Sequence, residues 1–472
     1  MSGLFSSLSS SVSALSAQSR AVEISGKNLA NVNNPAYARQ RVVLGSLGTI
    51  QTAQGPESMG VTALGVEQTR DSLLDQQVAR EAALTASYTA QQQAYQRAEA
   101  GLGESVSGTQ SSGTSSSTSD NGISAALDDF FGSFQSLAAN PTDPGQRQTL
   151  LANTSILTDR LQLADQRVTQ VTSDLNTQIS TDVDSANRLL QTVADLNGQI
   201  ARFEINNPGS AVDLRDQRQA DLEQLATKLP VSLQTSGSGQ VQLVAKDGSG
   251  ANVVLVDGSA VQGTVAFTGT QITAGVPATA LALSAGSIQG ALAARDGGVK
   301  TLSDNLNQLA AQLVTSVNAA YNPTGLTGNF FAPAGVTAGT IALAAGVTPN
   351  NLKASDGGPA GDNTVATAVA QLATQSFSTA GSPPDQIDGT FGGFLSTTTS
   401  NLGQAVASAT ARVQDQTNIE QLVRSQRDGI SGVSLDEEMA NLLQYQRAFQ
   451  ASSRVFTTID DLIDTVVNKM GV

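Results

Sequence analysis

Residues 434–470, which read SLDEEMANLLQYQRAFQASSRVFTTIDDLIDTVVNKM, decide the expected fold of this chain. An apolar side chain returns at every seventh position, at Leu435, Leu442, Phe449, Phe456, Ile463 and Met470. A seven-residue repeat holds an apolar stripe on one face of an α-helix, and such a stripe favours packing against another helix. The stretch therefore predicts a C-terminal helix that needs a helical partner.

The first thirty residues carry a second apolar row with the same period. Its members are Met1, Leu8, Leu15, Val22 and Leu29. Pro35 disfavours the helical conformation at Asn34, so this first helix is expected to end near Asn33. Because a lone helix with a narrow apolar stripe leaves that stripe in water, two such termini indicate a protein that acts by assembling.

We predict that residues 1–34 and 434–472 pair with each other and then pack against neighbouring subunits through one terminal seam. The terminal seam comprises Leu8, Leu15, Val22, Leu29, Leu435, Leu442, Phe449, Phe456 and Ile463. Polar and small residues interrupt both stripes, so the isolated helices are expected to be disordered before assembly. The alternative is that both stripes are core positions of a single folded chain, as in most amphipathic helices.

Composition excludes several classes of partner. The chain has 472 residues, of which 39% are apolar, enough for several domains with buried cores. Its net charge of −15 opposes phosphate backbones and anionic lipid, so neither nucleic acid nor membrane is an expected partner. No run of eighteen apolar residues occurs and no positive charge precedes Arg20, so neither a membrane-spanning helix nor a cleaved signal peptide is expected.

The chemistry available to the chain is narrow. There is no cysteine, histidine or tryptophan, which removes thiol chemistry, the usual general base near neutral pH and the commonest transition-metal ligand. No phosphate-binding loop, nucleophile elbow or dinucleotide glycine motif occurs either. We therefore expect no enzymatic activity, no cofactor and no metal site.

Acidic residues near the C-terminus have two interpretations. Ser434 and Glu437 fit a capping box, in which the serine oxygen accepts from the Glu437 N–H while the glutamate accepts from the Ser434 N–H. The carboxylates at 436–438 are alternatively a metal or catalytic group. The three aspartates within 460–464 are expected on a solvated helix face, with a divalent cation as the alternative.

Between the termini, helical patterns surround one β-rich segment. Residues 144–208 repeat apolar residues in steps of three and four without an internal proline, which predicts one very long helix. Leu189 and Phe203 are expected in its core, and Asp182 at its rim. Helices are also expected at 212–228 and 287–320. Short β-branched runs separated by glycine turns at 231–284 predict an antiparallel β domain.

The expected fold is mainly α with an inserted β-rich domain, and its long coiled-coil-like helices pair the N- and C-termini in one terminal domain. The expected domains are a terminal coiled-coil assembly domain (1–34 plus 434–472), a mostly helical rod domain (35–230 plus 286–433) and a β-rich outer domain (231–285). Residues 321–362, with one expected strand at 340–343, belong either to the rod domain or to the β insertion. A Ser/Thr/Gly tract at 103–122 is expected to be a flexible loop.

Residues 28–40, NLANVNNPAYARQ, resemble the N-terminal signature of flagellar rod, hook and hook-associated proteins. Ala30, Asn31 and Tyr37 match the pattern Ala-Asn-x-x-Thr-x-Gly-Tyr, while Asn34 and Ala36 replace its threonine and glycine. Residues 431–467 resemble the C-terminal end of the hook-associated members, and LRDQR at 214–218 resembles an internal helix of that family. The resemblance covers both terminal thirds of the chain and little of its middle.

The resemblance implies a structural protein that joins the flagellar hook to the filament as a ring of like subunits. Its implied neighbours are the hook protein on one side and a second junction protein or the filament protein on the other. It also implies export through the flagellar type III apparatus without a cleaved signal peptide, the help of an export chaperone, and an extracellular place in the bacterial flagellum. The terminal helices would form the inner layer, with the rod domain outside it and the β domain outermost.

Three other functions stay open on the sequence. One is a different axial subunit of hook or rod type, against which the acidic start of the C-terminal motif argues. Another is an extracellular hydrolase on an axial scaffold, although the β insertion lacks histidine, cysteine and metal-spaced carboxylates. The third is an adhesin built on 231–285, which no residue pattern there distinguishes from a passive spacer.

Overall fold

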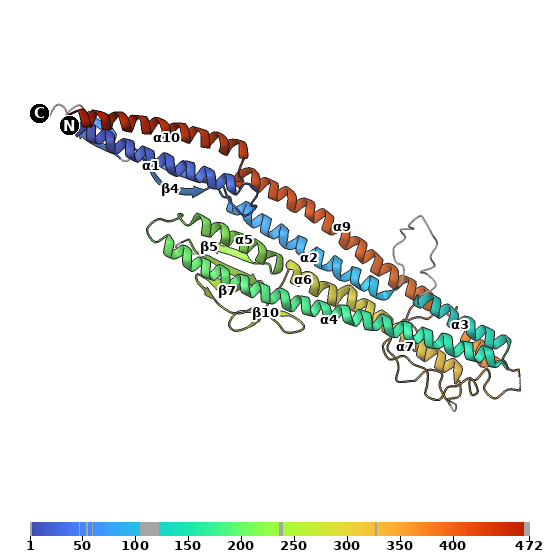
Figure 1. Cartoon of the computed structure of the whole chain (residues 1–472). Coiled ribbons are helices and arrows are strands. Elements are labelled where there is room, and N and C mark those ends of the chain that lie inside the picture. The colour runs from blue at the N-terminus through green and yellow to red at the C-terminus, as the bar shows by residue number, and fades with distance from the viewer. Residues whose placement is uncertain are drawn as a thin grey trace. The chain divides into compact units, whose positions relative to one another are not determined.

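A computed structural model describes residues 2–46, 48–52, 55–58, 60–103, 122–235, 239–325, 328–359 and 361–466. They form two compact units, the first from Met1–Thr85, Asp182–Gly286 and Gln416–Val472, the second from Ala86–Thr181 and Ser287–Asp415. The predicted fold class, mainly α with long terminal helices and a small β-rich insertion, is confirmed (Figure 1). The expected loop at 103–122 lies almost wholly outside the described residues, as do Met1 and Met470.

Both chain ends lie in the first unit as long antiparallel helices that run side by side (Figure 1). Helix α1 spans Ser2–Ala30 and is shorter than expected, because the backbone after Ala30 closes into turns. Helix α10 spans Leu435–Asp464. An antiparallel hairpin of β1 (Gln40–Ser46) and β4 (Val61–Gln68) lies against α1. The short pair β2 (Thr49–Thr52) and β3 (Gly55–Ser58) lies between these two strands in the chain.

The β insertion also belongs to the first unit. Its larger sheet is antiparallel, with strands in chain order: β5 (Ser232–Thr235), β6 (Val241–Lys246), β7 (Asn252–Asp257) and β8 (Ala260–Val261). A second antiparallel sheet contains β9 (Ala266–Phe267), β10 (Ile272–Ala274) and β11 (Thr279–Ala280). The amide of Asn197 ties the larger sheet to helix α4 (Pro144–Phe203), because its Nδ2 donates to the carbonyls of Val241 and Gly258, both at 2.8 Å.

The second unit is a helical bundle around an aromatic core. Its helices include α3 (Ile123–Ala139), α7 (Lys300–Tyr321), α8 (Thr364–Gln371) and parts of α2 (Ser72–Leu102), α4 and α9 (Phe391–Ser431). Seven phenylalanine rings meet there, with neighbouring centroids 4.9 to 6.0 Å apart: Phe130, Phe131, Phe134, Phe330, Phe331, Phe377 and Phe391. Large buried rings in tilted and edge-on contact give this unit a rigid core.

The prediction of a helix over 287–320 is wrong in one respect, because this helix is interrupted. Helix α6 (Gly286–Ala294) is followed by a π-helical turn, Arg295–Val299, in which Gly297 leaves the helical region, and only then by α7. A Cβ placed on Gly298 would lie 2.7 Å from Cε1 of Tyr95. The two glycines thus let the backbone pass close to this tyrosine of α2, which a regular helix with side chains would not allow.

Four details predicted from the sequence are corrected. On α4, Leu190 rather than Leu189 is fully buried, because the buried row steps by four from Ala186, and Phe203 is 66% exposed at the end of the helix. Asp182 is buried rather than at the rim, since Lys228 at the end of α5 (Val212–Lys228) donates to it at 2.8 Å. Instead of a strand at 340–343, the described residues have an isolated bridge between Phe331 and Leu343.

The three-part domain division stays a prediction. None of the described helices is long and apolar enough to span a membrane.

Candidate assembly site at the chain termini

The terminal-seam residues of α1 are only half-buried. Leu8, Leu15, Val22 and Leu29 have intermediate exposure. The fully covered face of this helix lies beside them and consists mainly of small and polar side chains, namely Ser11, Ala17, Ala21, Ile24, Ser25 and Asn28. Small side chains allow close approach of the neighbouring backbone, so α1 is held inside the first unit by this face and keeps part of its apolar row uncovered.

The terminal-seam residues of α10 are more open. Leu435 and Phe449 are exposed, whereas Leu442, Phe456 and Ile463 are half-buried. Further exposed apolar side chains are Met439, Leu443, Val455 and Leu462 along the same helix and Val466 just beyond its end. Its one buried side chain in the described range is a charged one, Glu438. A helix with this many uncovered apolar groups has apolar surface to offer to a partner.

A buried asparagine joins the two terminal helices where α1 ends and α10 begins. The Nδ2 of Asn28 donates to the Gln40 carbonyl at 2.8 Å and to Glu438 Oε2 at 3.0 Å. Its Oδ1 accepts from the Tyr37 hydroxyl at 2.8 Å and from the Gln40 N–H at 3.0 Å. All four hydrogen-bonding positions of the amide are thus used, which is the condition for burying a polar group at low cost.

Arg39 completes this contact from the segment that precedes β1. Its Nε donates to Glu438 Oε1 at 2.8 Å and its Nη1 to Glu437 Oε2 at 2.7 Å. The Arg39 backbone N–H also donates to the Ser431 carbonyl at the end of α9, at 2.8 Å. We call Asn28, Tyr37, Arg39, Gln40 and Glu438 the terminal junction. It fixes the start of α10 to the end of α1 and to the segment before β1.

The expected helix cap is partly formed. Ser434 lies at the N-cap of α10 with an extended backbone, and its oxygen accepts from the Glu437 N–H at 3.5 Å. The Glu437 carboxylate binds Arg39. Acidic residues in the first turn also favour the positive end of the helix dipole.

The motif residues form the turn between α1 and β1, and this turn leads into the terminal junction. Ala30 is exposed at the last position of α1, and the Asn31 side chain donates back to the Lys27 carbonyl at 2.9 Å. The Asn34 side chain accepts from the Ala36 N–H at 3.2 Å, so it closes the turn in which the family pattern has a glycine. Burial, followed by the charges of Asp216, Asp213 and Glu438, raises the pKa of Tyr37. Its phenol therefore stays protonated as a donor to Asn28.

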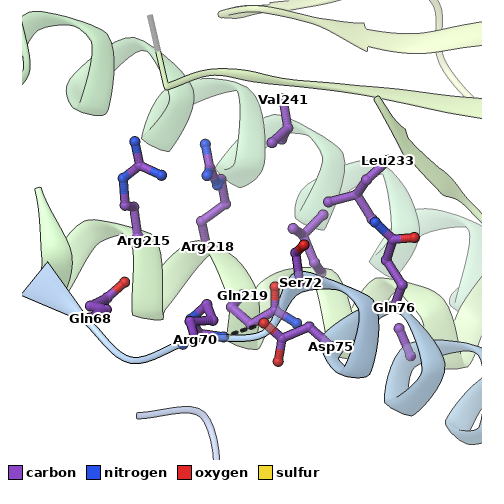
Figure 2. A pocket seen from close by; sticks show the side chains of 12 residues that line it. Gln68, Arg70, Ser72, Asp75, Gln76, Arg215, Arg218, Gln219, Leu233 and Val241 are labelled. Carbon is purple, nitrogen blue, oxygen red and sulfur yellow. Dashed lines mark hydrogen bonds and ion pairs between the residues drawn. The ribbon is translucent and has the colours of Figure 1, made fainter. Parts of the chain in front are cut away.

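A second group of ion pairs, centred on Arg70, stabilises the turn that the motif residues form. Arg70 donates to Asp75 at 2.9 Å, to Asp216 of α5 at 2.5 Å and to the Ala36 carbonyl at 2.9 Å; its pair with Asp75 is the dashed line in Figure 2. Burial raises the pKa of Asp216 to about 6, although Arg70 and the Ala38 N–H oppose this rise. Nearby, Arg427 of α9 donates to the Pro35 carbonyl at 2.8 Å and to Glu223 at 2.7 Å.

Glu204 gives a pH prediction for the turn between α4 and α5. Burial opposes its ionisation, but two hydrogen bonds from Arg215 and backbone N–H groups of Gly209 and Ala211 outweigh burial and lower the pKa of Glu204 to about 2. A depressed carboxyl pKa adds stability above the ordinary value of 4.5, and this contribution disappears as pH falls from there toward 2.

We therefore expect the stability difference between wild type and Glu204→Gln to be constant above pH 5 and to shrink toward pH 3. Urea unfolding followed by circular dichroism at each pH measures it. The exposed Glu67, replaced by glutamine, is the matched control. A difference that does not depend on pH would contradict the role given to Glu204.

The sequence does not single out Asn28, Arg39 or Glu438 as contacts between the chain ends. Asn28 lies beside the apolar stripe of the first helix, one residue before Leu29, and a single buried asparagine at a helix–helix contact is a known way to fix register. This is the signal that could have identified it. Glu438 is predicted only as a charge at the helix start. In the described part of the chain, no group of three or more acidic side chains could hold a metal ion.

Two family models match the chain. Residues 109–331 match "Flagellar hook-associated protein FlgK helical domain", and residues 425–470 match "Flagellar basal body rod FlgEFG protein C-terminal". The second match covers α10 and its junction with α9. The two terminal helices are held together by one polar junction, and the chain matches models of flagellar proteins. Together these observations define a structural protein of the flagellar axis.

Comparison with individual proteins shows which flagellar protein the chain is similar to. The chain is 27% identical to flagellar hook-associated protein 1 of Bacillus subtilis, over 100% of this chain and 99% of the relative. It is 23% identical to the protein of the same name from Escherichia coli, over 98% of this chain and 99% of the relative. Over nearly its whole length the chain is thus similar to flagellar hook-associated protein 1. A solved structure of the flagellar hook junction protein FlgK from Burkholderia pseudomallei is 23% identical, with a TM-score of 0.46, covering 54% of this chain and 46% of that one.

Proposed function

We propose that this chain, a structural subunit of the bacterial flagellum at the junction between hook and filament, assembles through the terminal seam. One observation carries the proposal: α10 is fixed at its start by the buried Glu438, while the terminal-seam residues that follow are exposed or only half-buried. In the seam, Leu435 is 48% and Phe449 40% exposed. Beside it on the same helix, Leu443, Val455 and Leu462 are each more than half exposed. Covering such a side chain in a neighbouring subunit gains on the order of 1 to 2 kcal/mol.

The finer parts of the proposal follow from this role. Like subunits form a ring, with the hook protein on one side and a second junction protein or the filament protein on the other. An export chaperone covers the apolar ends before assembly, and the chain leaves the cell through the flagellar export apparatus without loss of a signal peptide. The subunit acts by contact alone and not as an enzyme.

Deleting residues 436–472 tests the proposal. The β insertion is held by its own strands and by Asn197, so its cooperative unfolding is expected to persist in the shortened chain. Incorporation into hook–filament junctions, scored by immunogold labelling of isolated flagella, is expected to disappear. Labelling of junctions at the wild-type level would contradict the proposal. Labelling along a long structure would instead favour a hook or rod subunit.

A further inference from the structure

A cavity of about 260 Å³ in the first unit is lined by three arginines. It lies between the start of α2, one face of α5 and the strands β5 and β6 (Figure 2). Arg70, Arg215 and Arg218 contribute to its wall, together with the polar side chains of Ser72, Gln76 and Gln219. Ser72 and Gln76 are exposed, so solvent reaches the cavity.

The charges of these arginines are not compensated equally. Arg70 is paired with Asp75 and Asp216, and Arg215 makes two hydrogen bonds with Glu204. Arg218 is only 6% exposed, and the hydrogen bonds described for it run from Nη1 to two neutral oxygens, Asn197 Oδ1 at 2.8 Å and the Gly239 carbonyl at 2.9 Å. Among the described residues, no carboxylate lies within 4.0 Å of its guanidinium nitrogens.

The surroundings of Arg218 favour an added negative charge. Burial and then the neighbouring charge of Arg215 lower its pKa to about 10, so a nearby anion would relieve both effects. Guanidinium presents its donors in a planar fork that suits carboxylate and phosphate oxygens. The N–H groups at the start of α2 already donate to Asp71 Oδ1, so the attraction for an anion rests on the arginines. Asp75, the acidic side chain in the wall, is paired with Arg70 through Oδ2, while its buried Oδ1 has no hydrogen-bond partner among the described residues.

We propose that this cavity is a binding site for a small oxyanion, held by Arg218, with the Ser72 hydroxyl and the amides of Gln76 and Gln219 as further donors. A bound anion would link the start of α2 to α5. These two helices also flank the ion pairs of Arg70 that support the motif turn, so occupancy is expected to stabilise the first unit. The proposal is independent of the assembly function.

The test uses the full chain and inorganic phosphate as the probe. Thermal unfolding is followed by circular dichroism in sodium phosphate and in sodium chloride at equal ionic strength and pH, and calorimetry measures the affinity for phosphate. We expect a saturable rise of Tm in phosphate that chloride does not reproduce. Arg218→Gln is expected to weaken phosphate binding by about tenfold or more, since it removes a charge-assisted contact.

Arg202→Gln is the matched control, because Arg202 is exposed on α4 and the substitution changes the net charge equally. It is expected to bind phosphate as wild type does. If Arg218→Gln does not fold, Ser72→Ala carries the test, since this exposed hydroxyl is expected to contribute about threefold in affinity. Equal Tm values in phosphate and chloride, or unchanged affinity in the variants that remove cavity donors, would overturn the proposal.

Discussion

Replacing Glu438 by alanine is expected to release the start of α10 from the rest of the first unit. The buried carboxylate accepts from Arg39 at 2.8 Å and from Asn28 at 3.0 Å, and alanine leaves both donors without their acceptor. Removing one partner of a buried charged pair costs about 3 to 5 kcal/mol; because Arg39 is partly exposed and keeps Glu437, we expect about 2 to 3 kcal/mol. Hydrogen exchange of the amides in 435–445 and at the end of α1 should become markedly faster.

Asp436→Ala is the control for this substitution. Asp436 lies in the same first turn but is exposed, so its loss removes only a favourable interaction with the helix dipole, of about 0.3 to 1 kcal/mol. Exchange rates that are equal in the two variants would show that Glu438 is not the anchor of the helix.

Phe449→Asp is expected to abolish incorporation into the junction while leaving the soluble subunit intact. Phe449 is 40% exposed on α10, so a carboxylate there costs little in the monomer. In an assembled seam the same carboxylate would be buried without a partner, which costs several kcal/mol at each subunit contact. Motility in soft agar and immunogold counts of junctions measure the loss.

Gln450→Asp is the matched control, because Gln450 is the next residue, is exposed and receives the same charge. It is expected to assemble. Loss of motility in both variants would mean that the added charge, rather than the apolar face, matters. Normal motility of the Phe449→Asp variant would show that Phe449 does not take part in the assembly contact.

A helix or a strand could be predicted where its residue pattern is compatible with only one type of secondary structure. The apolar repeat between Pro144 and Pro208 forms α4, which ends at Phe203, and the β-branched runs after Pro230 form the β insertion. The interruption at Gly297 was not predictable from its own segment, because its cause is Tyr95, some two hundred residues earlier in the chain. Likewise, Asp182 is buried because Lys228 reaches it from another helix.

The candidate site was predictable in position but not in detail. The heptad rows and the motif around Tyr37 point to the chain ends, and the structure brings Asn28, Tyr37 and Glu438 together there. The terminal junction depends on polar contacts across about four hundred residues of sequence, for which local periodicity holds no information. Which apolar residues face a neighbouring subunit stays a prediction, since half-buried Leu8 and Leu442 fit both contact within the chain and contact between subunits.

The most direct test of assembly through α10 is a labelling measurement. Because the chain contains no cysteine, Leu443→Cys and, as a control on the β6–β7 turn, Ala251→Cys each introduce a single thiol. Both positions are exposed in the subunit and should react with a maleimide at similar rates. In isolated hook–filament junctions, we predict that the thiol at 443 becomes at least about tenfold less reactive while that at 251 is unchanged. Equal reactivity of the thiol at 443 in subunit and junction would contradict assembly through this face.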